Sequence, residues 1–386
     1  MLNTRFSKLF LSLGLIFSAH TYAELSLVDQ SQIFSDQDHF KLTTSGSIRL
    51  QALNFDHYDE SNQSQKYRRD GYSAGSRMYV NADYAFNERT HLLAGYQNYF
   101  NLPKMLDWEG HYNQNDEDFT TEQAYFGISD TEFGTLKFGK MYSVYYDVVG
   151  TKTDLWDYDT LAQPQTWSPV AYFDGTQAAS KMLRYEKKNQ LVDLYAAYLF
   201  KDQTAVADTN IVYERKSGVE LAADVHVTKS LSWASSYKYN DANLISAGEA
   251  QNFKQEMWAT SLFYFDGHWM FGLGAGWYKN LVPNFSAYGL QSELQTQALL
   301  DTEAYGAEYY AGYHFNIADH GIKFVQPYVM GNTLKYTSGD DFKRRDLGVG
   351  VAARFNHGLG FDYERLYTHD SWNTPDMHLF RLRYEW

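Results

Sequence analysis

The chain has 386 residues and a formal net charge of −14, and so acidic a chain argues against nucleic acid as a partner. It has no cysteine, which excludes a disulfide framework, thiolate chemistry and cysteine-bound metal. The mean hydropathy of −0.51 is typical of a water-soluble protein, but aromatic residues make up 17% of the chain, and this excess is a first indication of a transmembrane β-barrel.

The first residues form a secretory signal peptide rather than part of the fold. Arg5 and Lys8 give a basic start, and residues 9–19 form an apolar run that is too short to cross a bilayer as a helix. Thr21 and Ala23 then offer small side chains at the positions that a signal peptidase reads. We expect a signal peptide at residues 1–23, with a short membrane anchor as the alternative, and a single domain at residues 24–386.

From residue 45 onward, short segments alternate between apolar and polar side chains, which is the pattern of β-strands with two different faces. In one of them, Met78 and Val80 lie on one face, whereas Arg77 and Tyr79 lie on the other. Sixteen strands are expected, at residues 45–54, 75–86, 89–100, 119–129, 133–140, 178–187, 190–200, 218–227, 231–240, 255–265, 268–279, 303–315, 322–335, 346–356, 359–368 and 377–386.

The connections alternate strictly between short turns, such as residues 266–268, and long loops. The long loops are expected at residues 55–74, 101–118, 142–177, 201–217, 241–254, 280–302, 336–345 and 369–376. Residues 211–213 could form a strand of their own, which would spoil the even count, so they are assigned to the fourth long loop. Turns on one side and loops on the other indicate an all-β fold, an antiparallel up-and-down barrel across an outer membrane.

The last strand carries the sharpest barrel pattern. One face holds His378, Phe380, Leu382, Tyr384 and Trp386, and the other holds Arg381, Arg383 and Glu385. A soluble β-sandwich is the alternative reading of such alternation. It would leave the aromatic C-terminus exposed to water, and it does not account for the alternation of short and long connections.

The third long loop breaks the strand pattern for more than thirty residues, and a segment of that kind inside a compact domain is usually functional or disordered. Its many rings argue against disorder. It also carries a series of acids, at Asp147, Asp154, Asp157, Asp159 and Asp174. We interpret it as a loop that packs inside the barrel and shapes a passage there.

Two motifs resemble the Gram-negative general porins. Residues 133–140, followed by residues 142–150, look like that family's fifth strand running into its third loop, and residues 71–79 look like its second strand. The resemblance implies a sixteen-stranded homotrimer in the Gram-negative outer membrane, with the third loop, residues 142–177, as the constriction. It also implies that Tyr384 and Trp386 form the signal that the barrel-assembly machinery reads.

The family sets acids of this loop against basic residues of the barrel wall. The resemblance therefore implies constriction acids at Asp147, Asp154, Asp157 and Asp159, and wall bases at Arg49, Arg77 and Arg184. The strand parity also places these three arginines on the inward face. An arginine facing lipid would be energetically costly, which favours the same assignment. Where the family often has a wall arginine in its fourth strand, this chain offers only Thr121, Gln123 and Tyr125.

Two aromatic residues of the third loop have two interpretations. Trp156 and Tyr158 could stack against sugar rings, as aromatic tracks do in sugar-selective channels, or they could simply pack the loop against the wall. The first interpretation supports an oligosaccharide-selective porin as an alternative function. The second is compatible with a general channel.

The function expected from the sequence is a passive outer-membrane channel for ions and small hydrophilic solutes, with a preference for cations. Its partners would be outer-membrane lipid and lipopolysaccharide, and no nucleic acid. A barrel acting mainly as an adhesin or receptor through its long loops is a further alternative. No nucleophile elbow or zinc-hydrolase motif marks an enzyme, and we expect no cofactor and no metal site.

Overall fold

The computed structural model describes residues 25–29, 39–59, 63–114, 116–155, 168, 170–206, 210–281, 301–319, 321–338, 343–371 and 373–386. Residues 1–23, the expected signal peptide, lie outside these ranges. In the described part, no helix has both the length and the apolar character needed to cross a membrane.

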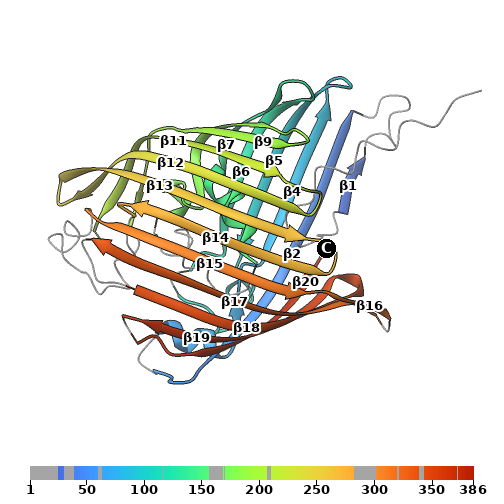
Figure 1. The fold of residues 1–386 in the computed structure, drawn as a ribbon, viewed down its shortest axis with the longest axis vertical. Coiled ribbons are helices and arrows are strands. Elements are labelled where there is room, and N and C mark those ends of the chain that lie inside the picture. Colours follow the sequence, from blue (N-terminus) through green and yellow to red (C-terminus); the bar gives the residue numbers. More distant parts are fainter. Residues whose placement is uncertain are drawn as a thin grey trace, which may run out of the picture.

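The fold is a closed antiparallel β-barrel of sixteen strands, as the sequence predicts. Figure 1 shows the strands running obliquely around the barrel. The barrel strands are β2 (Phe40–Phe55), β4 (Arg77–Ala85), β5 (Thr90–Phe100), β6 (Phe119–Asp130), β7 (Gly134–Tyr142), β8 (Ala178–Lys187), β9 (Val192–Leu199), β11 (Val212–His226), β12 (Leu231–Ser246), β13 (Glu249–Phe265), β14 (Trp269–Lys279), β15 (Glu303–Tyr313), β17 (Ile322–Ser338), β18 (Lys343–Phe355), β19 (Leu359–Asp370) and β20 (Met377–Glu385).

Short pieces extend this barrel at its ends. They are the strands β1 (Leu25–Asp29), β3 (Tyr72–Ser73), β10 (Asp202–Ala205) and β16 (Phe315–Asp319), and the helices α1 (Gln63–Arg69), α2 (Leu102–Met105) and η4 (Asn356–Gly358). β1 pairs with the first half of β2, on the edge that β20 occupies farther along. The helices α3 (Val144–Val148), η2 (Gly150–Lys152) and α4 (Ala171–Asp174) belong to the third loop.

The barrel closes where the first and last strands meet. β2 pairs with β20 from Ser47 opposite Glu385 to Phe55 opposite Met377. Trp386 continues the ladder, because its backbone exchanges two hydrogen bonds with Gly46, at 3.0 and 3.2 Å. A Cβ at position 46 would lie 2.3 Å from the Trp386 ring, so only glycine leaves room for that ring at the seam.

The alternation of side chains separates a lipid-facing surface from a polar interior. The outer face of the strands exposes large apolar side chains, among them Phe126, Leu221, Trp258 and Leu382. Residues of opposite parity are buried and polar or charged, among them Gln51, Glu186, Asp224, Lys238 and Arg383. Such a pattern fits a barrel with lipid outside and a polar lumen. The mean hydropathy does not reveal it, because the apolar and polar residues of each strand average out.

Two loop assignments from the sequence are wrong. Val212 and Tyr213 belong to β11, which starts six residues before the expected position, so these residues lengthen an expected strand and the even count survives. The fifth long loop is absent from this structure, because β12 and β13 extend toward each other and meet at the turn Ala247-Gly248. Both turn residues have positive φ, at 50° and 88°, as a tight hairpin requires.

The short turns of the opposite end agree with the sequence. Asp266 shapes the one between β13 and β14, where its carboxylate accepts hydrogen bonds from the backbone N–H groups of His268 (2.9 Å) and Trp269 (2.8 Å). These hydrogen bonds lower the pKa of the Asp266 carboxyl below its ordinary value. A carboxylate held in this way fixes the turn and, with it, the register of the two strands.

A β-bulge in the fourth barrel strand, β6, changes which of its residues face inward, and the sequence prediction for this strand is wrong at that point. The register of β5 and β6 shifts between Gln97 and Asn98, which leaves Glu122 without a partner in the ladder. A bulge exchanges the two faces of a strand from that residue on. Glu122 is therefore buried, whereas the Thr121 hydroxyl lies 3.3 Å from the hydroxyl of the outward-facing Tyr96. The inward-facing position that we expected Thr121 to occupy is therefore occupied by the acid Glu122.

Candidate functional site in the third loop and the facing wall

The third loop begins by docking a short helix on the inner wall. β7 ends at Tyr142, and Ser143 caps α3 by accepting a hydrogen bond from the backbone N–H of Tyr146 at 2.9 Å. The Glu220 carboxylate, which projects inward from β11, accepts the N–H of Val144 at 2.7 Å. The first N–H groups of a helix have no hydrogen-bond partner within the helix. The Glu220 carboxylate accepts one of them and thereby holds the start of α3 against β11.

The same helix is attached to the wall by apolar packing. Its buried residues join inward-facing apolar side chains of the wall in one cluster, made of Met141, Val144, Tyr145, Val148, Val149, Ala179, Met182, Ala197, Leu199, Ala222, Ala234, Met257, Ala259, Tyr278, Leu281, Ala304, Leu334 and Tyr336. The polar interior thus contains an apolar patch against which the loop packs. The green helices inside the barrel in Figure 1 are this segment.

A buried ion pair holds the next turn of the loop. Lys152 is 4% exposed and donates to the Asp224 carboxylate on β11 (2.8 Å) and to the Ser232 hydroxyl on β12 (2.6 Å). A buried charge is costly unless it is paired, so the ion pair between Lys152 and Asp224 fixes the position of the loop on the wall.

The loop then follows the wall across β13, β14 and β15. Ser261 donates to the backbone oxygen of Val149 at 3.0 Å, and Thr153 donates to the Glu308 carboxylate. A Cβ at Gly272 would lie 2.6 Å from the backbone oxygen of Lys152, so the loop touches the backbone of β14 directly. The described first half of the loop therefore lies flat against one side of the barrel.

The returning half is anchored through Asp174. This residue is fully buried and accepts hydrogen bonds from the Thr176 hydroxyl (2.7 Å) and from the Gln255 amide (3.1 Å). The Asn240 amide donates to its backbone oxygen at 2.6 Å. Asp174, one of the loop acids, is thus a structural anchor.

The structure places two of the four expected constriction acids. Asp147 has a 41% exposed side chain, and Asp154 is also exposed and accepts a hydrogen bond from the Tyr146 hydroxyl at 2.5 Å. Asp157 and Asp159 lie outside the described residues, as do Trp156 and Tyr158. Both described acids lie on a loop that the barrel surrounds, with one side attached to the wall.

Arg184 lies at the base of the loop. It is buried, donates to Asp147 at 2.5 Å and pairs with Glu186 at 2.9 Å. The guanidinium also donates to the backbone oxygen of Tyr142 at 3.0 Å, where the loop leaves the barrel. This arginine points inward, as expected, and it is joined to the loop by one of the loop's own acids.

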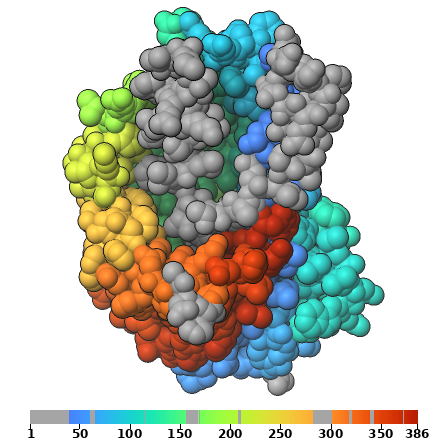
Figure 2. All heavy atoms as spheres, turned by 90° about the vertical axis from the view of Figure 1, so that its right-hand side faces the viewer, coloured from blue at the N-terminus to red at the C-terminus, as the bar shows by residue number. Residues whose placement is uncertain are grey.

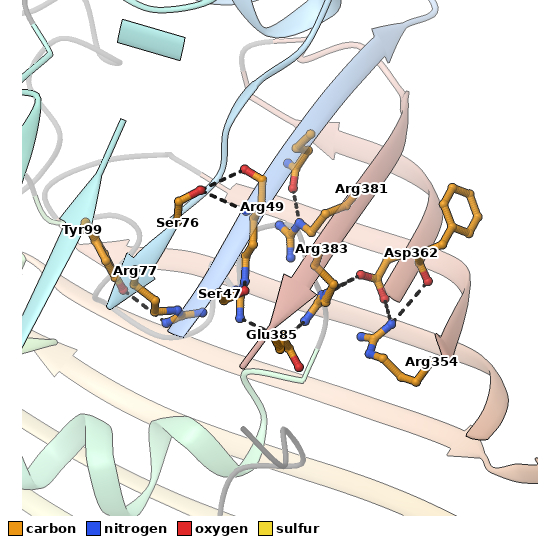
Figure 3. Close-up of polar contacts among 12 residues, drawn as sticks. Ser47, Arg49, Ser76, Arg77, Tyr99, Arg354, Asp362, Arg381, Arg383 and Glu385 are labelled. Atoms are coloured by element: carbon orange, nitrogen blue, oxygen red, sulfur yellow. Dashed lines mark hydrogen bonds and ion pairs between the residues drawn. The ribbon is translucent and has the colours of Figure 1, made fainter. Parts of the chain in front are cut away.

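Arg49 and Arg77 lie together on a different part of the wall. Arg49 on β2 is buried and lies 3.8 Å from Glu385 of β20. Arg77 on β4 donates to the Tyr99 hydroxyl at 3.4 Å and covers the Tyr99 ring at 5.6 Å. Figure 3 shows both arginines in one row with side chains of the last strands.

Three further arginines belong to this row, and the sequence interpretation left them out. Arg381 and Arg383 are buried on β20, and Arg354 projects from β18. The Arg381 guanidinium donates to the side-chain oxygen of Gln51 at 2.6 Å. The inward parity of the last strand could have identified Arg381 and Arg383, because it places them on the same face as Glu385.

Figure 2 views the barrel from the end that lies on the right of Figure 1. Its surface is hollowed there, and green atoms from the region of the third loop lie deep in the hollow. The described residues contain no group of three or more histidine, cysteine, aspartate or glutamate side chains that could hold a metal ion. The arrangement is a loop and a charged wall inside a barrel.

Neither a protein-family model nor a curated protein matches this chain. Solved structures do match. Salmonella typhi OmpF in complex with daunomycin has a TM-score of 0.65 at 15% identity, over 90% of this chain and 98% of that chain. An anion-selective porin from Comamonas acidovorans gives 0.60 at 10% identity, over 90% and 100%. OmpT of Vibrio cholerae in a trimer form gives 0.57 at 14% identity, over 90% and 100%. The resemblance to general porins is confirmed for the fold.

Proposed function

We propose that this chain is an outer-membrane porin, a passive diffusion channel for ions and small hydrophilic solutes, and not an enzyme. The observation that carries the proposal is the third loop. It is held inside a closed barrel by Glu220, Lys152 and Thr153, on one side of a polar interior, while a row of arginines lies on other strands of the wall. The fold likeness to outer-membrane porins supports the same function.

We further propose that the channel prefers cations. Among the buried side chains in the described part of the chain, carboxylates outnumber lysines and arginines. The exposed loop acids Asp147 and Asp154 add negative charge. A narrow passage with low-dielectric walls concentrates the field of such fixed charges, and rings of acids favour cations.

Reconstitution of the purified chain into a planar lipid bilayer tests the channel proposal. We expect discrete conductance steps in KCl, because a loop attached to one side of a polar barrel leaves a path for ions. A bilayer that stays silent with correctly folded protein would contradict the proposal and favour the adhesin or receptor alternative.

An oligosaccharide-selective channel that uses aromatic residues of the third loop is the second candidate, and the described part of that loop holds several rings. Tyr142 and Tyr146 meet edge to face at 5.4 Å, and the Lys140 ammonium lies 5.8 Å from the rings of both Tyr172 and Phe173. Rings with hydroxyl groups can stack on sugar faces and bond their hydroxyls. Blocks of the ionic current at micromolar oligosaccharide would favour this candidate over a general channel.

The partners follow from the same proposal. We propose a homotrimer in the Gram-negative outer membrane, in contact with lipid and lipopolysaccharide, made from a precursor cleaved after Ala23. We also propose that Tyr384 and Trp386, which stack at 6.2 Å, form the signal for the barrel-assembly machinery. Deletion of Trp386 should then lower the amount of the folded, heat-modifiable form in the membrane, and an unchanged yield would contradict this role.

The orientation of the barrel can be tested with cysteines, because the chain has none of its own. Lys229 and Ala247 are exposed and flank the two ends of the same strand, β12. Ala247 lies at the end where the long loops emerge, so an Ala247→Cys variant on intact cells should react with a membrane-impermeant maleimide. The matched Lys229→Cys variant should react only after the cells are broken, and the reverse pattern would invert the orientation.

A further inference from the structure

The arginine row on the wall is joined to carboxylates in an alternating chain of charges. Arg354 on β18, Asp362 on β19, Arg383 and Glu385 on β20 and Arg49 on β2 follow one another in that order. Each neighbouring pair has opposite charge, as Figure 3 shows. The barrel seam, where β20 meets β2, lies within this series of ion pairs, so the contact between Glu385 and Arg49 joins the last barrel strand to the first.

Asp362 joins the first two arginines of the series. One carboxylate oxygen accepts from Arg354 at 2.7 Å, and the other accepts from Arg383 at 2.7 Å from Nε and at 2.6 Å from Nη2. The carboxylate is 1% exposed, so it is held in a single arrangement. Both Arg383 nitrogens contact the same carboxylate oxygen, and such charge-assisted contacts are shorter and stronger than hydrogen bonds between neutral groups.

The second carboxylate of the chain is held more loosely. Glu385 lies 3.3 Å from Arg383 and 3.8 Å from Arg49, and both contacts use the same oxygen. Arg381 is adjacent and donates to the neutral Gln51 side chain. Among the described contacts of this row, Asp362 therefore makes the shortest contacts with two wall arginines at once.

We infer that Asp362 is a selectivity-determining residue of the channel, because its carboxylate offsets part of the positive field of the two wall arginines that it contacts. The inference rests on the proposed channel function and adds a residue on the wall to the acids of the loop. Without this carboxylate, the net charge of the row would be more positive, although Arg383 would keep its contact with Glu385. The wall would then attract anions and oppose the loop acids. The arginines of this row favour anions, and Asp362 weakens that contribution to the field of the interior.

The test compares permeability ratios of K⁺ and Cl⁻ from reversal potentials in a low-salt KCl gradient, with the full mature chain in planar bilayers. The Asp362→Asn variant keeps the shape of the side chain and removes its charge. We expect its K⁺/Cl⁻ ratio to fall by about two-fold or more, since a unit charge acts strongly across a narrow pore at low ionic strength. Asp362→Glu keeps the charge and should keep the wild-type sign.

A charge-compensated variant separates charge from packing. Asp362→Asn combined with Arg383→Gln restores the net charge of the row, so its ratio should return close to the wild-type value. A shift that persists in the double variant would show that altered packing causes it and would overturn the inference. An Asp362→Asn channel with the wild-type ratio would overturn it too.

A third variant covers the case in which Asp362→Asn does not assemble. Arg383→Gln alone leaves Asp362 with one arginine fewer, so the K⁺/Cl⁻ ratio should rise, and an unchanged ratio would contradict the inference. These outcomes differ from a failure of the channel proposal, in which the wild-type chain itself gives no conductance.

Discussion

Replacement of Lys152 by methionine is expected to loosen the third loop and to destabilise the barrel. The change leaves the Asp224 carboxylate buried without its cation, and breaking a buried ion pair in this way costs about 3–5 kcal/mol. Because the loop is fixed at this point, single-channel currents should become larger and noisier. Unfolding in detergent, followed by the heat-modifiable shift in electrophoretic mobility, should occur at a lower temperature.

The control for this prediction removes both charges. In Lys152→Met with Asp224→Leu, no buried charge is left unpaired, and an apolar pair of similar volume is often as stable as the ion pair that it replaces. The double variant should therefore recover most of the lost stability. A Lys152→Met channel with wild-type stability and quiet wild-type currents would show that this lysine does not hold the loop.

Opposite shifts in ion selectivity are expected from the loop and from the wall. Asp154 is exposed on the loop, so Asp154→Asn should weaken the preference for cations, and Asp154→Asn with Asp157→Asn should weaken it further. Arg77→Gln should strengthen the preference, because it removes positive charge from the wall. Each single change should alter the K⁺/Cl⁻ ratio by about two-fold at low salt, and about 1 M salt should suppress both effects.

Tyr146→Phe is the matched control for the loop variant. It removes the hydroxyl that donates to Asp154 at 2.5 Å, but it keeps the charge of that acid. The selectivity of this variant should stay close to that of the wild type if charge sets it. If Asp154→Asn and Asp154→Asn/Asp157→Asn both left selectivity and conductance untouched at low salt, these acids would not line the passage.

The strands could be predicted because two-residue alternation is local information. All sixteen expected strands are present, and their inward and outward faces are those that the alternation indicates, except in β6 on the Thr121 side of the bulge at Glu122. The ends of the strands were predicted less accurately. Strands can continue to pair beyond the membrane, where neither face of the strand has to be apolar. Val212, Tyr213 and the hairpin at Ala247 show this, because these strands continue to pair beyond the segments that the alternation marked as strands.

The site was predictable only in part, for two physical reasons. The bulge at Glu122 depends on the register between β5 and β6, which one strand alone does not encode. Pairing between distant residues is also invisible in the sequence. Arg184 meets Asp147 of the loop, and Asp362 meets two arginines from neighbouring strands, through contacts that only the closed barrel creates.

The central claim is a channel whose interior favours cations, and the reversal potential of the wild-type chain tests it most directly. The measurement uses the purified mature protein in a planar bilayer, with KCl more concentrated on one side and low ionic strength on both. The account predicts discrete conductance steps and a reversal potential with the sign of cation selectivity. A reversal potential of the opposite sign, from folded and conducting protein, would contradict it.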